Sequence, residues 1–173
     1  AGTERNEKTR SYRAKESHMG NTCALTGHRR LPANFDKVAL YEALEAMIIR
    51  GCDRFLCGMA RGFDLEALAC LTQLRKKYPI ALVACIPYRG QESGFPEREK
   101  EKYRALLKQC DERVYLSGEY SQGCLLARDR YMVDRADVLL AYCTRKTGGT
   151  AYTVRYAAEK GVAVENLAHG QKI

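Results

Sequence analysis

Short apolar runs alternate along most of the chain with segments in which apolar residues recur every three or four positions. The short runs are apolar throughout, and this pattern predicts strands of a sheet that is covered on both faces. The longer segments predict amphipathic helices, because that spacing places apolar side chains on one side of a helix. We expect strands at about 23–26, 54–57, 80–86, 113–116, 138–143 and 162–166.

Amphipathic helices are expected between these strands. The first contains Leu40, Leu44 and Met47 at helical spacing. The others extend over about 63–78, 96–110, 122–135 and 149–160. Strands that alternate with helices of this length indicate right-handed βαβ units. The predicted fold class is therefore α/β, a Rossmann-like three-layer sandwich with a mainly parallel sheet.

The length of 173 residues suits one domain with a substantial core and is short for two. Residues 1–20 are polar and lack periodicity, so we expect a flexible leader outside the fold. Within it, Ser17-His18-Met19 resembles the junction left by an expression tag, with Met19 as the native start. Residues 21–173 are expected to form the single domain.

The composition is typical of a soluble globular protein, with 46% hydrophobic and 29% charged residues. The longest apolar runs, such as 138–142, are too short to cross a bilayer, and nothing resembles a signal peptide. The eight cysteines show no CxxC spacing, so we expect free thiols in a reducing compartment and no metal site. A cytoplasmic location without a membrane partner follows as the expectation.

The net charge of +8 raises the question of an anionic partner. Residues 1–18 carry five Lys/Arg and three Asp/Glu, which contributes +2 and leaves +6 for the rest. Part of that remainder alternates with acids, as at 97–102, which is typical of a solvated helix face. A moderate excess without a Lys/Arg stripe favours a small phosphorylated ligand, with nucleic acid as the less favoured partner.

Glycine, hydroxyl and arginine side chains collect after several strands, in the loops 26–30, 58–64, 87–91 and 144–150. Ligands of parallel α/β sheets bind beyond the carboxyl ends of the strands. Glycine lets backbone amides approach a phosphate closely, and the start of the next helix adds unpaired N–H groups. The sequence therefore predicts an anion site at this edge. The alternative is that the glycines only form turns and that Thr150 caps a helix.

Individual side chains in these loops allow more than one role. Arg61 can pair with Asp64 to orient the loop, or reach a phosphate itself. His28 can bind the ligand, carry a proton or simply pack. Tyr88 and Gln91 can stack on and hydrogen-bond a base, although a tyrosine at the edge of the core is the commoner outcome.

The segment 128–135 places three arginines on one expected helix, where Arg128 and Arg135 share a face. They can both point to the sheet edge or to a partner, or the helix can be an ordinary amphipathic surface helix. No Walker-type GxxxxGK[ST], GxGxxG or nucleophile-elbow motif occurs. Residues alone therefore lead only to a binder of a phosphorylated ligand.

Taken together, these loops resemble the SLOG superfamily, which unites the DNA-processing Smf/DprA proteins with the LOG phosphoribohydrolases. Within it, the chain is most similar to the YpsA-like family of bacterial proteins. Residues 58–64 match the G-x-A-R-G-[IF]-D signature of the superfamily. The other matching stretches follow in order over residues 22–167: they are 26–29, 87–88 with Gln91, 128–134 and 148–153.

The resemblance implies a nucleotide-derived ligand, such as a nucleoside monophosphate, a nucleotide sugar or an ADP-ribose-like molecule. The glycine and arginine edge, combined with the lack of the catalytic glutamate of LOG enzymes, favours a sensing or regulatory domain, and no cofactor is expected. LOG enzymes carry a P-G-G-x-G-T-x-x-E motif whose glutamate serves glycosidic cleavage, but here that position is Thr153. The LOG arginine matches Arg128, and the lysine beside it corresponds to Asp129. A threonine supplies no carboxylate for this chemistry.

Two alternatives to sensing follow from the same resemblance. The first is an N-glycosidic phosphoribohydrolase in which Asp64, Glu92 or His28 replaces the missing acid. The second is DprA-like binding of single-stranded DNA. A homodimer is also compatible with the resemblance.

No catalytic residue or metal ligand is assigned from the sequence. The residues expected to bind the ligand are Gly27, His28, Arg29, Gly58, Ala60, Arg61, Gly62, Asp64, Pro87, Tyr88, Gln91, Arg128, Gly148, Gly149, Thr150 and Thr153.

Overall fold

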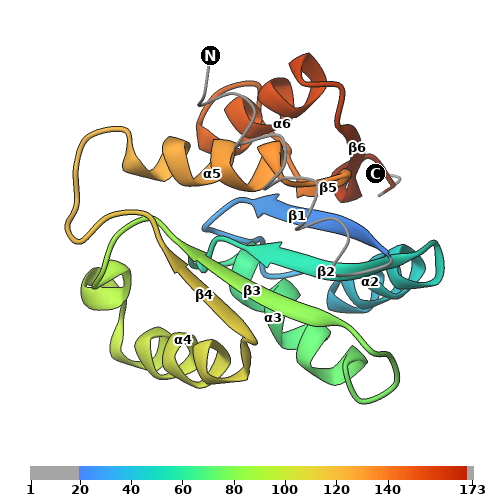
Figure 1. Cartoon of the computed structure of the whole chain (residues 1–173), viewed down its shortest axis with the longest axis horizontal. Helices are drawn as coiled ribbons and strands as arrows, with labels where there is room; N and C mark the ends of the chain where they lie inside the picture. Colours follow the sequence, from blue (N-terminus) through green and yellow to red (C-terminus); the bar gives the residue numbers. More distant parts are fainter. Residues whose placement is uncertain (1–19, 171–173) are drawn as a thin grey trace, which may run out of the picture.

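The computed structural model describes residues 20–170, and in this range it contains one sheet of six parallel strands (Figure 1). The predicted leader lies outside the described residues, which begin at Gly20. The order of the strands across the sheet is β4-β3-β2-β1-β5-β6. Their bounds are Asn21–Gly27 for β1, Cys52–Cys57 for β2, Ala81–Ile86 for β3, Glu112–Tyr115 for β4, Val138–Tyr142 for β5 and Ala163–Asn166 for β6.

Helices connect successive strands, and the predicted Rossmann-like α/β class is confirmed with every strand pair parallel. The helices are α2 (Lys37–Ile49), α3 (Phe63–Leu74), α4 (Glu97–Gln109), α5 (Cys124–Asp134) and α6 (Gly149–Glu159). Two short 3-10 helices, η1 (Gln91–Gly94) and η2 (Leu167–Gly170), complete the described elements.

Two helix bounds differ from the sequence expectation for local reasons. Helix α3 ends at Leu74 rather than 78, and residues 75–78 form turns before Pro79. A proline disfavours helical backbone in the residue that precedes it. Helix α5 begins at Cys124 rather than 122, because Gly123 has a φ of 80° and residues with positive φ do not belong to a right-handed helix.

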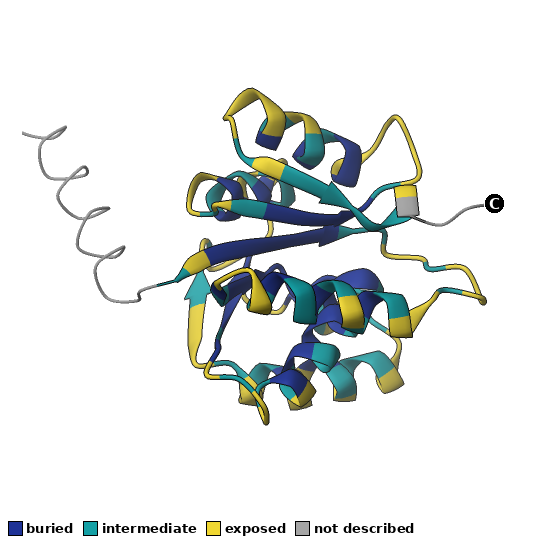
Figure 2. Ribbon diagram, turned by 90° about the vertical axis from the view of Figure 1, so that its right-hand side faces the viewer, coloured by how far each residue is buried: buried dark blue, intermediate teal, exposed yellow. Residues whose placement is uncertain are grey.

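The core lies in two layers, one on each face of the sheet. Helices α2, α3 and α4 cover one face, which receives Cys23 and Leu25 of β1. Helices α5 and α6 cover the other face, which receives Ala24 of the same strand. Figure 2 shows the result: the central strands are buried, and exposed residues gather on the outer sides of the helices. Alternate residues of an apolar strand are therefore buried on opposite faces.

The chain order creates a switch point beside β1. From β1 the chain adds β2, β3 and β4 outward on one side, and then returns to place β5 on the other side of β1. Connections on the two sides of this point leave the sheet over opposite faces, which opens a crevice at the carboxyl ends of β1 and β5. No described helix is long and apolar enough to cross a lipid bilayer.

Gly27, the last residue of β1, lies directly against the ring of Phe63, the first residue of α3. A methyl group at position 27 would collide with this fully buried ring. We expect Gly27→Ala to lower the free energy of unfolding by about 1–3 kcal/mol, the usual cost of overpacking. Chemical denaturation would measure the change.

Gly94→Ala is the matched control, because a Cβ there meets nothing within 4 Å. Equal stabilities of the two variants would show that Phe63 moves aside without cost.

Candidate functional site

A cleft of about 520 Å³ lies at the switch point, where the carboxyl ends of the strands face the starts of two helices. Its lining residues come from the loops that follow β1, β2 and β5, from the connection between β4 and α5, and from α5 itself. They are Thr26, Gly27, His28, Arg29, Arg30, Ala60, Asp64, Tyr120, Gly123, Cys124, Leu125, Leu126, Arg128, Asp129, Arg145, Thr147, Gly148, Gly149 and Thr150.

Two helices start at this cleft without a side-chain cap. Gly148 precedes α6 with a φ of 96°, and Gly123 precedes α5 with a φ of 80°. Neither helix has a side chain that caps its first amides. Both N-termini therefore direct positive dipole ends and backbone N–H groups without a side-chain acceptor to one space, which favours an anion. The alternative role of Thr150 as N-cap is wrong, because Gly148 holds that position.

Arginines add positive charge to the rim of the cleft. Arg29 and Arg30 follow β1, and Arg145 follows β5 on the other side of the switch point. Arg29 and Arg145 are exposed and share the lining with the two helix N-termini, so the cleft combines cationic side chains with backbone donors. This combination is the usual chemistry of a phosphate site.

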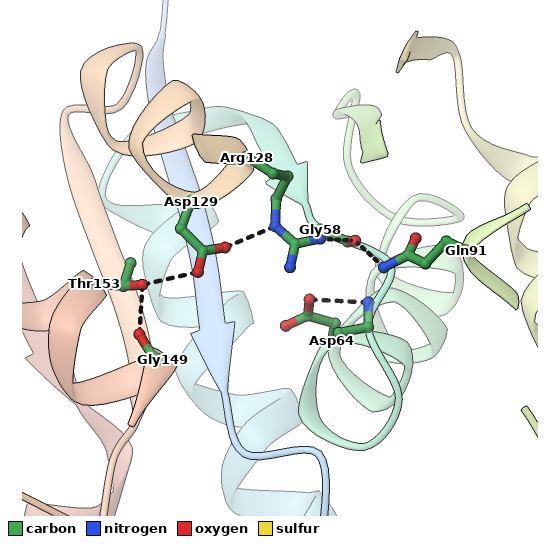
Figure 3. Close-up of polar contacts among 8 residues, drawn as sticks. Gly58, Asp64, Gln91, Arg128, Asp129, Gly149 and Thr153 are labelled. Carbon is green, nitrogen blue, oxygen red and sulfur yellow. Dashed lines mark hydrogen bonds and ion pairs between the residues drawn. The ribbon is translucent and has the colours of Figure 1, made fainter. Parts of the chain in front are cut away.

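A buried guanidinium organises the floor of the cleft (Figure 3). Arg128 on α5 is only 4% exposed, and it donates through Nε to Asp129 Oδ1 at 2.7 Å and through Nη1 to the carbonyl of Gly58. A Cβ at position 58 would lie 2.7 Å from Arg128 Nη1. Gly58 is therefore a glycine because this guanidinium approaches it, and the loop after β2 is tied to α5.

The same network reaches the start of α6 through Thr153. The Thr153 hydroxyl lies 3.1 Å from Asp129 Oδ2 and 2.8 Å from the carbonyl of Gly149. With one proton, it donates to one of these oxygens at a time. Thr153 is fully buried and does not line the cleft, so its role is to join α5 to the first turn of α6.

Asp64, in the first turn of α3, is the buried carboxyl of the cleft. Burial raises its pKa to about 7, the nearby Asp129 acts in the same direction, and Arg128 and the Ala60 N–H oppose the shift. Its Oδ2 accepts a hydrogen bond from Ala60 N at 3.2 Å. A carboxyl that titrates near neutral pH in a cleft can exchange a proton with a bound ligand.

His28 joins the loop after β1 to the loop after β5. The backbone N–H of Thr144 donates to His28 Nε2 at 2.9 Å, so this nitrogen is an acceptor and a neutral ring carries its proton on Nδ1. Burial, together with the charge of Arg145, lowers the pKa of His28. The neutral ring thus holds one wall of the cleft in place.

Two predicted contact residues have other partners. Arg61 pairs with Glu99 on α4 through Nε and Nη2, in place of the expected pairing with Asp64. Gln91 uses both ends of its amide, donating to Gly58 O at 3.2 Å and accepting from the Tyr103 hydroxyl at 3.2 Å. Both residues stabilise the scaffold behind the cleft.

Gly62 does not line the cleft, and its role is to let two loops pack closely. A Cβ there would collide with the carbonyl of Arg29, and its φ of 76° suits glycine. The next residue, Phe63, donates its N–H to His28 O at 3.1 Å. These contacts hold the loop after β2 against the loop after β1.

The structure therefore brings together part of the predicted site. Nine of its residues line the cleft: Gly27, His28, Arg29, Ala60, Asp64, Arg128, Gly148, Gly149 and Thr150. Seven lie outside the lining: Gly58, Arg61, Gly62, Pro87, Tyr88, Gln91 and Thr153. Arg135 does not reach the cleft with Arg128, because its guanidinium covers the Tyr131 ring at 3.6 Å.

Several lining residues were not found from the sequence. Tyr120, Leu125 and Leu126 come from the region around the start of α5, and no motif distinguishes them. Asp129 and Arg145 carried a weak signal, since both lie within or beside stretches of the family resemblance. All eight cysteines are free, as expected, and no group of side chains within residues 20–170 could hold a metal ion.

The fold and the cleft define a class: a Rossmann-like domain with a cleft at its switch point that two helix N-termini face. The YpsA family model, described as the YspA SLOG family, matches residues 28–166. The chain belongs to this family.

Relatives are bacterial proteins of similar length. The chain is 27% identical over 117 residues to an uncharacterized SPbeta prophage-derived protein, YoqJ, of Bacillus subtilis, covering 60% of this chain and 68% of the relative. It is 29% identical over 138 residues to a UPF0398 protein of Bacillus thuringiensis, covering 75% of this chain and 72% of the relative.

The fold is shared with solved structures of DNA processing protein A (DprA). The TM-score is 0.61 with the Helicobacter pylori protein and 0.63 with the Streptococcus pneumoniae protein, at 17% and 16% identity. Each match covers 84% of this chain, but only 64% and 50% of the two DprA chains. At this identity the likeness shows the fold alone.

The raised pKa of Asp64 predicts a pH dependence of stability. Between the unfolded value of 3.8 and the folded value of about 7, the folded protein holds a proton that the unfolded chain releases. The Asp64 contribution to the free energy of unfolding therefore grows as the pH falls from 8 to 5. In Asp64→Asn this contribution is absent, so the stability of the wild type should rise relative to the variant over the same range.

Thermal denaturation at several pH values would measure this difference. Glu101→Gln, which removes an exposed carboxyl on α4, is the control and should follow the wild type. A constant difference between wild type and Asp64→Asn from pH 8 to pH 5 would show that Asp64 titrates outside this window.

Proposed function

We propose that the cleft binds a phosphorylated, nucleotide-derived ligand and that the protein acts as a sensing or regulatory domain. The observation that carries the proposal is the convergence of two uncapped helix N-termini on one cleft, with Arg29 and Arg145 in its lining. Backbone amides and guanidinium groups of this kind recognise phosphate oxygens.

The phosphate is expected at the start of α6. Gly148 and Gly149 have open space where a Cβ would lie, so an anion can approach the amides of this turn closely. Arg145 comes from the same connection between β5 and α6. The sugar is then expected toward Asp64, whose carboxyl can accept hydrogen bonds from hydroxyl groups when it is ionised.

Sensing is favoured over LOG-type catalysis by the position that corresponds to the LOG glutamate. Thr153 is fully buried, and its hydroxyl bonds to Asp129 and Gly149. It offers no carboxylate to a sugar. A binding protein without turnover fits this substitution.

Arg145→Ala is expected to weaken the binding of a nucleoside 5′-monophosphate roughly tenfold, the effect of losing one charge-assisted hydrogen bond. Lys146→Ala removes the same charge from the next position, which does not line the cleft, and should bind like the wild type. Isothermal titration calorimetry against nucleoside monophosphates, nucleotide sugars and ADP-ribose would measure both. No binding of any of these compounds to the wild type would refute the proposal.

Asp64 favours a second candidate, hydrolysis of the bond between base and sugar. In this reaction a water oxygen adds to the anomeric carbon, and the base leaves with the electron pair of the broken bond. Asp64 accepts a proton from the water and returns it to the departing base, so the products are the free base and the sugar phosphate. A carboxyl with a pKa of about 7 suits this transfer at neutral pH. Of the other expected substitutes, His28 lines the cleft and Glu92 does not.

Release of free base from nucleoside monophosphates, followed by chromatography, would test this candidate. We expect Asp64→Asn to reduce turnover at least a hundredfold, as is common on loss of an acid–base group. Unchanged turnover in Asp64→Asn would remove Asp64 from the mechanism.

A third candidate ligand is single-stranded DNA, because the solved structure of the Helicobacter pylori DprA concerns its mode of binding single-stranded DNA. If this chain bound DNA in the same cleft, an oligonucleotide would compete with the monophosphates, and its affinity would fall steeply with salt. Absence of competition would assign the cleft to small ligands.

A further inference from the structure

The connection between β4 and α5 carries an exposed aromatic ring into the cleft. Tyr120 is 63% exposed and belongs to the cleft lining, together with Leu125 and Leu126 of α5. The helix N-termini and arginines described above suit the binding of an anion. These three side chains have no role in that binding. An aromatic ring beside two leucines offers instead a surface for a flat, apolar group.

The position of this ring is fixed by its neighbours. Tyr120 packs edge-to-face against Tyr88, with ring centroids 5.4 Å apart and an angle of 82° between the rings. In such a pair the edge of one ring meets the face of the other, so Tyr88 covers at most one face of Tyr120. At least one face remains available for stacking.

The backbone of the connection is also held. The N–H of Arg89 donates to the carbonyl of Ser117 at 3.2 Å, which ties the connection to the segment after β3. The Ser117 hydroxyl donates to Glu119 O at 2.9 Å, and the N–H of Cys124 donates to Ser121 O at 3.2 Å. The ring is thus presented by an ordered loop, and stacking on it costs little ordering entropy.

The sheet places this ring away from the phosphate end. Tyr88 follows β3, whereas the start of α6 follows β5, and β2 and β1 lie between these two strands. Three strand spacings separate β3 from β5, which amounts to about 14 Å at the sheet edge. Figure 1 shows the connection from β4 to α5 extending beyond the sheet edge, at the left of the view. A ligand that contacts both the start of α6 and Tyr120 must therefore have its ring and its phosphate far apart. In a nucleotide the ribose separates the two.

We infer that Tyr120, supported by Tyr88 and sharing the cleft lining with Leu125 and Leu126, is the base-stacking platform of the cleft and makes its ligand a nucleotide rather than a sugar phosphate. This inference rests on the proposed phosphate site. Stacking tolerates different bases because every base has a π-face, so Tyr120 selects for the presence of a base more than for its identity. Tyr88 itself then has an indirect role: it packs against the ring that stacks on the base.

The test compares ligands with and without a base on the full chain. Calorimetry would measure the 5′-monophosphates of adenosine, guanosine, cytidine and uridine beside ribose 5-phosphate. We expect Tyr120→Ala to weaken the four nucleotides about tenfold, the usual effect of losing one aromatic–base stack, and to leave ribose 5-phosphate unchanged. Tyr120→Phe keeps the ring and should retain nucleotide binding.

Leu116→Ala is the control, because Leu116 is an exposed apolar residue of the same connection that does not line the cleft. Equal weakening of nucleotides and ribose 5-phosphate in Tyr120→Ala, or no weakening of either, would overturn this inference and leave the proposed phosphate site intact. A wild-type protein that binds neither kind of probe would overturn both.

Discussion

The cleft depends on one buried cation. The guanidinium of Arg128 is removed from water, and a buried charge is tolerated only when it is paired and hydrogen-bonded. Asp129 supplies the opposite charge and Gly58 a carbonyl, so a single side chain ties α5 to the loop after β2. Asp129 in turn meets Thr153 of α6. The helices on one face of the sheet are thereby fixed relative to the strand ends that they overhang.

This arrangement divides the glycines of the site into two groups. Gly27, Gly58 and Gly62 are small because Phe63, Arg128 and the Arg29 carbonyl lie where a side chain would be. Gly123 and Gly148 have open space around them and begin helices with positive φ values. The first group allows close packing of the loops around the cleft, and the second begins the helices that face it. Close packing and open helix N-termini thus come from the same residue type in two different environments.

The charges within the cleft are arranged from centre to rim. Buried Asp64 has a pKa near neutrality because burial and Asp129 outweigh the attraction of Arg128 and the Ala60 N–H. Arginines and helix N-termini lie around it. Membership of the YpsA SLOG family and the fold shared with DprA place this crevice in a known architecture. Thr153, which by resemblance corresponds to the LOG glutamate, is fully buried and supplies no carboxylate to the cleft.

The sequence by itself determined the six strands, the parallel sheet and the edge at which the loops gather, because apolar runs and helical spacing are local patterns. It also located the glycines before α6 and the buried residue Arg128 as parts of that edge. Only the tertiary structure decided which of those residues face the cleft. Arg61 and Gln91 have partners on α4 and in the loop after β2 that are distant in sequence. Tyr120 reaches the cleft through its contact with Tyr88, 32 residues earlier in the chain. Such pairings depend on which segments meet in space, and no local pattern of residues encodes them.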